Sequence, residues 1–413
     1  MPAFPESARR VQRPMLLAFS IILGTFEGAD IASIGLALSR ISRDLGLDPA
    51  QGGMCAAASM FGLMIGAIVG GRLADVHGRK PVLIVSMLLL GLCAFGTAHA
   101  WDYHSLLTLR FLAGLGMGGL MPVLIAAAGD SASAGFRATA ISMLMASGGV
   151  GAACAGIVAI HPDWRMIFYF GALGPLVMLP VLIFGLKDTG EQAERGDEAL
   201  PVKMPFATVL FGEGRAPGSI LIWVTAFATA LVSYVLINWL PSLLIRQGVS
   251  EQASHSAMIT YSIGAIAGNL IAGMAMDRGA ARAIYWCGYL GASCCMFSLT
   301  LGIDGPGLYA LTFGINFFML AAQLATFSLT SVYYPVPVRA GGIGAMVCAG
   351  RLGSVIGPLA VGQLLNAGLE ASDVLIGLIP ACLIALILGL SFERLVRGRR
   401  GPSIVGASLV GAK

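Results

Sequence analysis

The sequence predicts an all-α membrane protein with twelve transmembrane helices, arranged as two pseudo-symmetric halves of six. Of its 413 residues, 57% are hydrophobic and only 11% are charged, whereas roughly a quarter of the residues in a typical soluble domain carry charge. Apolar stretches of about 20 residues, each long enough to cross a bilayer core, recur from end to end. Short sequence patterns also return at one fixed offset between the two halves.

The expected spans are joined mostly by short polar turns, and many of the 56 glycines fall within them. Glycine is common in membrane helices because it lets neighbouring backbones approach closely. An even number of spans places both termini on one side of the membrane. The spans are residues 15–36, 51–71, 81–99, 105–128, 136–159, 165–186, 218–241, 253–275, 282–301, 306–332, 339–366 and 372–392.

The distribution of basic residues predicts the orientation, because cytoplasmic loops carry an excess of Lys and Arg. If both termini are cytoplasmic, most of the 25 Lys and Arg residues lie on that side. The outer side then holds only Arg40, Arg43, Arg165 and Arg246. The first span is full length and lacks a small-residue cleavage site, so we expect it to be retained.

One hydrophilic stretch, residues 187–217, divides the chain into an N-terminal six-helix half (1–186) and a C-terminal half (218–413). We interpret it as a cytoplasmic linker. Three patterns return 202 residues later, each at the corresponding span or span boundary, which indicates a duplicated six-helix unit. They are Gly71-x-x-x-Asp75 with Gly273-x-x-x-Asp277, Phe136-Arg137-Ala138 with Val338-Arg339-Ala340, and Gly148-x-x-Gly151 with Gly350-x-x-Gly353.

The turn after the second span reads Gly70-Gly71-Arg72-Leu73-Ala74-Asp75-Val76-His77-Gly78-Arg79-Lys80. It resembles the G-x-L-a-D-r-x-G-R-[KR] loop of the major facilitator superfamily, in which two six-helix halves enclose a substrate site near mid-membrane. The resemblance implies that Asp75 and Arg79 latch the cytoplasmic gate. A solvated basic turn that only sets topology is the alternative. The second copy, around Asp277, is degenerate and predicts a weaker latch.

Four charged residues are expected well inside the spans: Glu27, Asp30, Arg110 and Arg351. Burying an ionisable group in a membrane costs several kcal/mol, so such residues are functional candidates. Glu27 and Asp30 lie three residues apart, on one face of the first span. Two carboxylates this close repel each other in a low dielectric, which favours the protonated form of at least one of them. We therefore predict proton coupling here, with simple pairing to arginines as the alternative.

The two embedded arginines stay protonated and cannot release a transported proton. Arg351, within Gly350-Arg351-Leu352-Gly353, is our candidate for binding a substrate carboxylate. Arg110 begins Arg110-x-x-x-Gly114-x-Gly116-x-Gly118, which resembles a superfamily motif whose arginine assists proton handling. The alternative for Arg110 is a side chain that snorkels to the outer surface.

The first span reads Phe26-Glu27-Gly28-Ala29-Asp30, continuing to Gly35. It resembles the D-G-x-D-x-x-x-x-G element of the aromatic acid:proton symporter family, with Glu in place of the first Asp. This substitution and Ile237-Asn238-Trp239-Leu240-Pro241 are similar to the hydroxyphenylpropionate branch. The resemblance covers the whole chain and implies a bacterial inner-membrane importer of an aromatic carboxylate, driven by protons and working by alternating access.

Two departures from the family pattern bear on function. The family's acidic Ser-Glu stretch after the fourth span is replaced by Gly129-Asp130-Ser131, so Asp130 is the candidate partner of Arg137 in the gate. The fifth span lacks the Gly-Pro pair of drug antiporters, which counts against an exporter. A drug or metabolite exporter, or a carrier of another organic anion, stays the alternative.

An aromatic substrate requires a flat apolar wall and polar groups that orient the ring. Candidates for the wall are Phe26, Tyr234 and Trp239, and candidates for the polar groups are Asn238 and Gln323. Helix packing and interhelical hydrogen bonding are the competing explanations.

Nothing in the sequence indicates an enzyme, a cofactor or a metal site. Its five histidines are scattered, and its eight cysteines lack metal-ligand spacing, as expected of packing residues. The expected partners are a small aromatic acid, protons and the lipid bilayer, with no nucleic acid, and the chain is expected to act as a monomer.

Overall fold

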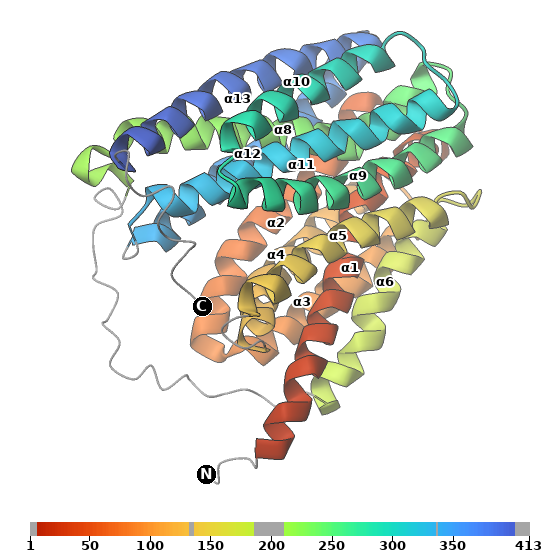
Figure 1. The fold of residues 1–413 in the computed structure, drawn as a ribbon. Coiled ribbons are helices and arrows are strands. Elements are labelled where there is room, and N and C mark those ends of the chain that lie inside the picture. The colour runs from red at the N-terminus through yellow and green to blue at the C-terminus, as the bar shows by residue number, and fades with distance from the viewer. Residues whose placement is uncertain (1–5, 132–135, 186–209, 336–337, 401–413) are drawn as a thin grey trace. The chain divides into compact units, whose positions relative to one another are not determined.

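The computed structural model describes residues 6–131, 136–185, 210–335 and 338–400 (Figure 1). Within these ranges the chain forms twelve α-helices, and each predicted span falls on one of them, which confirms the predicted twelve-helix all-α fold. They are α1 (Glu6–Leu45), α2 (Pro49–His77), α3 (Arg79–Thr97), α4 (Tyr103–Ser131), α5 (Arg137–Val158), α6 (Arg165–Pro180), α8 (Ala216–Arg246), α9 (Glu251–Asp277), α10 (Ala281–Leu299), α11 (Pro306–Tyr333), α12 (Arg339–Asn366) and α13 (Ala371–Arg400).

Eleven of the helices in the described ranges are long and apolar enough to cross a membrane. The exception is α10, which holds Arg282 and several polar residues among its apolar ones. Two of these, Tyr285 and Tyr289, are fully buried, and their hydroxyls bond to threonines of other helices. The hydropathy of α10 is therefore lowered by groups whose polarity is satisfied inside the protein.

Local sequence signals set several helix ends. Asp48 accepts a hydrogen bond from the Gln51 amide at 2.7 Å, and the Gln51 side chain accepts one from the Asp48 amide at 3.1 Å. This capping box, with Pro49 in the first turn, starts α2. Between α2 and α3 lies only Gly78, whose φ of 90° suits glycine. The predicted gating turn is thus one residue flanked by two helix ends.

The chain folds into two compact units, which we describe separately. Unit 1 comprises the described residues of Met1–Gly196, Ile237–Ser262 and Pro358–Leu369, and unit 2 those of Asp197–Leu236, Ile263–Gly357 and Glu370–Lys413. These units interleave along the sequence, and the two six-helix halves stay a prediction. Most of the predicted linker, 187–217, lies outside the described residues. Its last part forms the 3₁₀ helix Gly212–Gly214 and the start of α8.

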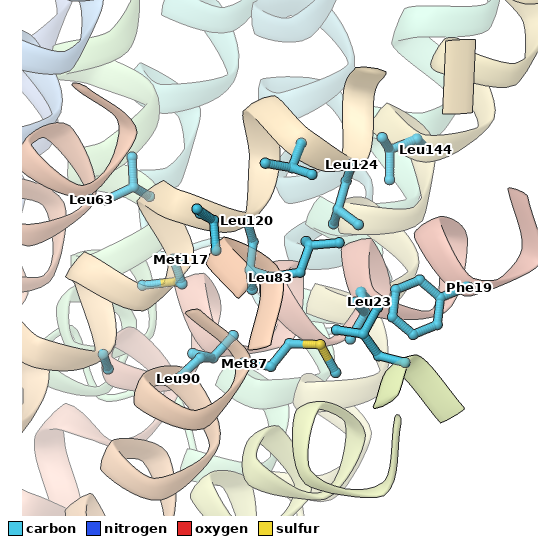
Figure 2. Packing of buried hydrophobic residues seen from close by; sticks show 14 of the residues in the cluster. Phe19, Leu23, Leu63, Leu83, Met87, Leu90, Met117, Leu120, Leu124 and Leu144 are labelled. Atoms are coloured by element: carbon cyan, nitrogen blue, oxygen red, sulfur yellow. The ribbon is translucent and has the colours of Figure 1, made fainter. Parts of the chain in front are cut away.

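In unit 1, α2 and α4 pack backbone to backbone. A Cβ atom on Gly62 would clash with the Phe111 carbonyl oxygen, and one on Gly66 with the Leu115 carbonyl oxygen. Such glycines permit the close approach typical of membrane helices. Beside this contact, apolar side chains of α1 to α5 form a buried cluster (Figure 2), which includes Phe19, Leu23, Leu63, Leu83, Met87, Leu90, Met117, Leu120, Leu124 and Leu144.

Unit 2 repeats this packing 202 residues later in the sequence. The space beside Gly264 is filled by the Phe313 carbonyl oxygen, and that beside Gly268 by the Phe317 carbonyl oxygen. A second contact repeats at the same offset, because Gly151 meets the Thr25 carbonyl and Gly353 meets the Phe227 carbonyl. Corresponding glycines therefore make corresponding contacts, which supports the internal duplication predicted from the sequence.

Candidate functional site

Two of the charged residues that the sequence predicts inside the spans, Asp30 of α1 and Arg110 of α4, form an ion pair inside unit 1. Arg110 Nη2 lies 3.0 Å from Asp30 Oδ2, and Arg110 Nη1 donates to Asp30 Oδ1 at 3.1 Å. Both side chains have 0% exposure. This is a two-pronged guanidinium–carboxylate contact in a site without water access, where such bonds are strongest.

Neighbouring helices fix the position of Arg110. Its Nε donates to Ser59 Oγ at 2.9 Å, and its guanidinium carbon lies 5.6 Å from the centre of the Phe168 ring. The glycine contacts of α2 with α4 bring Ser59 within reach. The alternative in which Arg110 snorkels to the surface is wrong, because the side chain is fully buried. Glu27, one turn before Asp30, is also buried.

Unit 2 contains a cavity of about 110 Å³ bounded by α8, α11 and α12. Arg351 lies in its wall and donates from Nη1 to the Tyr234 hydroxyl at 2.9 Å. Among the described residues, no carboxylate forms an ion pair with Arg351. The lining is completed by Ala226, Thr229, Ala230, Gln323, Thr326, Phe327, Met346, Val347 and Gly350.

This cavity combines a cation, aromatic rings and hydroxyl groups. A cavity of about 150 Å³ accommodates benzene in an engineered protein, so the present space admits only part of an aromatic acid unless side chains move. An arginine with no acidic partner in a partly dehydrated wall is suited to bind a carboxylate. Tyr234 and Phe327 can contact a ring.

Of the six predicted binding residues, the cavity brings together Arg351, Tyr234 and Gln323. The others lie elsewhere. The Trp239 indole nitrogen donates to the Pro358 carbonyl at 3.0 Å, the ring of Phe26 lies 5.2 Å from that of Phe170, and Asn238 is fully buried in unit 1. The cavity also contains Thr229, Thr326 and Phe327, which the sequence did not predict because threonine and phenylalanine are common in apolar spans.

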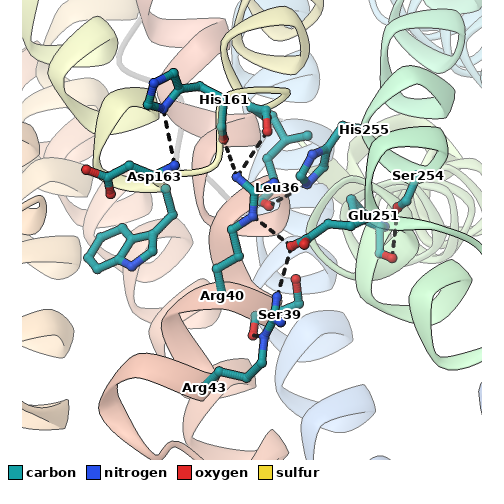
Figure 3. A network of polar contacts seen from close by, with 12 residues as sticks. Leu36, Ser39, Arg40, Arg43, His161, Asp163, Glu251, Ser254 and His255 are labelled. Carbon is teal, nitrogen blue, oxygen red and sulfur yellow. Dashed lines mark hydrogen bonds and ion pairs between the residues drawn. The ribbon is translucent and has the colours of Figure 1, made fainter.

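A polar network lies in unit 1 where α1 and α5 end and α9 begins (Figure 3). Arg40 Nε contacts Glu251 Oε1 at 2.7 Å, and the more exposed Arg43 contacts the same oxygen at 3.0 Å. Arg40 Nη1 also donates to the carbonyls of Ala159 and His161, at 3.1 and 2.6 Å. From the sequence, both arginines were predicted only to lie on the outer side of the membrane, and no role was predicted for Glu251.

Residues 20–358 match the sequence profile of the Major Facilitator Superfamily, which covers most of the chain. The chain belongs to the Major Facilitator Superfamily. The membership predicted from the turn after the second span is thereby confirmed.

Several relatives of this facilitator transport aromatic acids. It is 34% identical over 383 residues to the 3-(3-hydroxy-phenyl)propionate transporter of Escherichia coli (strain K12), covering 92% of this chain and 93% of that protein. It is 29% identical over 411 residues to the 4-hydroxybenzoate transporter PcaK of Pseudomonas aeruginosa, covering 90% of each. A gallate transporter of Pseudomonas putida is 28% identical over 386 residues, covering 86% of each.

Solved structures show the same facilitator fold. A D-xylose-proton symporter superposes with a TM-score of 0.74 at 17% identity, covering 92% of this chain and 96% of that one. A bacterial homolog of the human lysosomal transporter Spinster gives the same TM-score at 16% identity, covering 92% and 97%. At these identities the likeness concerns the fold alone.

The predicted gating residues of this facilitator are only partly described. The side chains of Asp75, Asp130 and Arg137 lie outside the described residues. Gly71 has open space where a Cβ atom would lie. The remaining three are exposed, namely Arg79, Asp277 and Arg339. Arg339 Nε donates to the Tyr334 carbonyl at 3.4 Å. The gating roles of all seven residues stay predictions.

One buried acid of the facilitator escaped the sequence analysis. Glu393 is 1% exposed and pairs with Arg397 one turn later on α13. The prediction named four charged residues well inside the spans, and Glu393, one residue past the last predicted span, was not among them. Hydropathy ended the last span at residue 392, whereas α13 continues to Arg400. The sequence spacing of Glu393 and Arg397 could have indicated this ion pair, since residues four apart share a helix face.

Proposed function

We propose that this facilitator imports an aromatic carboxylate together with protons across a bacterial inner membrane, with both termini in the cytoplasm. The observation that carries the proposal is the placement of Arg351 and Tyr234 in the wall of one cavity. The names of the relatives, which include hydroxyphenylpropionate, hydroxybenzoate and gallate transporters, agree with it.

Arg351 acts as the carboxylate clamp in this proposal. Its guanidinium offers two parallel donors, which match the two oxygens of a carboxylate. One donor is engaged by the Tyr234 hydroxyl at 2.9 Å, which holds the side chain in the cavity wall. The rings of Tyr234 and Phe327 would flank the substrate ring, and Gln323 would orient its polar substituent.

Asp30 and Arg110 form the proton-coupling pair. A proton that binds Asp30 removes the carboxylate charge that Arg110 neutralises, which weakens the two bonds from Arg110 to the Asp30 carboxylate. Glu27 lies one turn away and provides a second buried carboxyl group. The pair would thus alternate between an ionic state that holds the helices and a protonated state that releases them.

Release toward the cytoplasm would follow from opening of the Asp75–Arg79 latch, and Asp130 with Arg137 would belong to the same gate. The short turn at Gly78 supports this assignment, because it fixes the end of α2 against the start of α3. We propose that the facilitator works as a monomer.

Uptake of labelled acids by proteoliposomes tests the proposed function. With the outside acidic, wild-type protein should accumulate hydroxyphenylpropionate or hydroxybenzoate above the level of protein-free liposomes. Aliphatic dicarboxylates and a cationic drug should not accumulate. Extrusion of the aromatic acids, or preference for a drug, would instead favour an exporter.

A further inference from the structure

Two cavity threonines, Thr229 and Thr326, each contact a backbone carbonyl and a buried tyrosine hydroxyl. Thr229 donates its hydroxyl proton to the Thr225 carbonyl at 2.7 Å. The Tyr289 hydroxyl lies 2.6 Å from Thr229 Oγ1. Either oxygen can donate in this contact, and Tyr289 is the donor when the threonine proton stays on the Thr225 carbonyl. Thr229 then retains one acceptor position and no free proton.

Thr326 repeats this arrangement on α11. It donates to the Ala322 carbonyl at 3.1 Å, and the Tyr285 hydroxyl lies 3.2 Å from its oxygen. With the Thr326 proton on the Ala322 carbonyl, Tyr285 is the donor to Thr326. Both tyrosines are fully buried on α10, and their rings stack with an interplanar angle of 8°. In this arrangement both threonine oxygens line the cavity as acceptors, and the buried tyrosine hydroxyls lie behind them.

The spacing of the cavity residues fits a molecule with two polar ends. Thr229 and Tyr234, both on α8, are five residues apart, which corresponds to about 7.5 Å along the helix axis. This is comparable to the distance from the carboxylate to the ring hydroxyl in a hydroxylated aromatic acid. A carboxylate at Arg351 would therefore bring the far substituent of the ring toward the threonines.

We infer that Thr229 and Thr326 select substrates whose ring carries a hydrogen-bond donor. This inference rests on the proposed function and assigns its specificity to two residues. A ring O–H or N–H can donate to the threonine oxygens. A methoxy oxygen cannot donate, and an unsubstituted ring leaves the acceptors unpaired, which costs binding free energy.

The test compares four acids on one scaffold, with hydroxyl, amino, methoxy or hydrogen at the same ring position, as competitors of labelled uptake by wild-type protein. The hydroxyl and amino acids should bind about tenfold more tightly than the other two, since one net hydrogen bond has roughly that effect. Equal affinity of the methoxy and hydroxyl acids would overturn the inference. If none of the acids competes, the proposed function fails with it.

Variants of the two threonines test whether they cause the preference for the hydroxyl acid. The double variant Thr229→Val and Thr326→Val should lose the preference for hydroxyl while its affinity for the unsubstituted acid changes little. The matched control is Thr330→Val, which removes a buried hydroxyl of α11 outside the cavity lining and should keep the preference. A double variant that still prefers the hydroxyl acid would contradict the assignment.

A second inference comes independently from the network around Arg40 (Figure 3). Besides the Arg40–Glu251 pair, His255 Nε2 lies 3.2 Å from the Leu36 carbonyl oxygen. A Cβ on Gly35 would clash with the Ile237 carbonyl. These contacts tie the end of α1 to the end of α8 and the start of α9, at the face that the sequence predicts to be extracellular.

We propose that the Arg40–Glu251 pair is the latch that closes the outer face. Arg40 is mostly buried, with 11% of its side chain exposed, and it joins the α9 carboxylate to two carbonyls at the end of α5. A substrate arriving from outside would part α1 from α9, and this pair is the more buried of the two described charged contacts between them, Arg40–Glu251 and Arg43–Glu251. The contact of Arg43, 67% exposed, contributes little because solvent screens it.

Labelling of a buried cysteine tests the latch. Ser254→Cys, at a buried position next to the network, is introduced after Cys287, Cys294 and Cys348 are replaced by Ser. A membrane-impermeant maleimide is then added outside right-side-out vesicles. It should label the Ser254→Cys thiol up to about tenfold faster when Glu251→Gln is also present than when Glu251 is intact. The matched control, Arg43→Gln, should change the rate less than about twofold.

Three outcomes would overturn this second proposal. Unchanged labelling of the Glu251→Gln protein would exclude the pair as a latch. An equal effect of Arg43→Gln would remove the special role of Arg40. Faster labelling only in inside-out vesicles would place the network on the cytoplasmic face.

Discussion

Replacement of Asp30 by Asn should abolish accumulation of substrate driven by a pH gradient. Asn cannot take up a proton, so the buried pair with Arg110 no longer alternates between two charge states. Exchange of labelled for unlabelled substrate across the membrane should survive, because exchange does not require release of the proton. Uptake and exchange measured in the same proteoliposomes check this result.

The structure also predicts the cost of this change for stability. Removing one partner of a buried ion pair destabilises a protein by about 3–5 kcal/mol, but Asn keeps an oxygen that can accept from Arg110. We therefore expect a folded protein with a lower thermal midpoint. Asp304→Asn, a change in an exposed loop, is the control and should alter neither property. If the Asp30→Asn protein still concentrates substrate like wild type, Glu27 becomes the candidate coupling acid.

Replacement of Arg351 by Ala should remove detectable binding of the aromatic acid. A carboxylate in a partly dehydrated cavity needs a compensating cation, and loss of a buried charged partner costs several kcal/mol, about a hundredfold or more in affinity. Arg351→Lys should bind weakly, because it keeps the charge and loses the two parallel donors. Equilibrium binding of labelled substrate to purified protein provides the measurement.

The amide of the same acid is the control for charge. It lacks the negative charge and should bind poorly to wild-type protein, and its affinity should change little in Arg351→Ala. Near-normal affinity of Arg351→Ala for the acid would place the carboxylate clamp elsewhere. Arg110 is already paired with Asp30, so a substrate carboxylate could reach it only by displacing that acid.

The sequence predicted the fold well because hydropathy and glycine spacing are local signals. The offset of 202 residues, read from short patterns, recurs in the glycine contacts of the two units. Burial of Asp30 and Arg110 was equally predictable, since charge within an apolar span is rare. Their bonding to each other was only one of two possibilities, because they are 80 residues apart and hydropathy carries no pairing information.

The candidate site was less predictable, because the role of a residue depends on which neighbour it faces. Trp239 and Tyr234 are both aromatic residues of α8, yet one donates to the Pro358 carbonyl and the other lines the cavity. The hydrogen bonding of Thr229 in the cavity wall depends on Tyr289, which lies 60 residues later in the sequence. Glu251 is an ordinary helix-start acid in the sequence, and its contact with Arg40 spans 211 residues.

Proton movement on addition of substrate tests proton-coupled import most directly. Lightly buffered proteoliposomes with equal pH on both sides receive the preferred aromatic acid, adjusted to the same pH. The external medium should become more alkaline, because protons enter with the substrate. Protein-free liposomes and the Asp30→Asn protein correct for passive diffusion of the acid. An alkaline shift no larger than in these controls, or an acid shift, would contradict proton-coupled import.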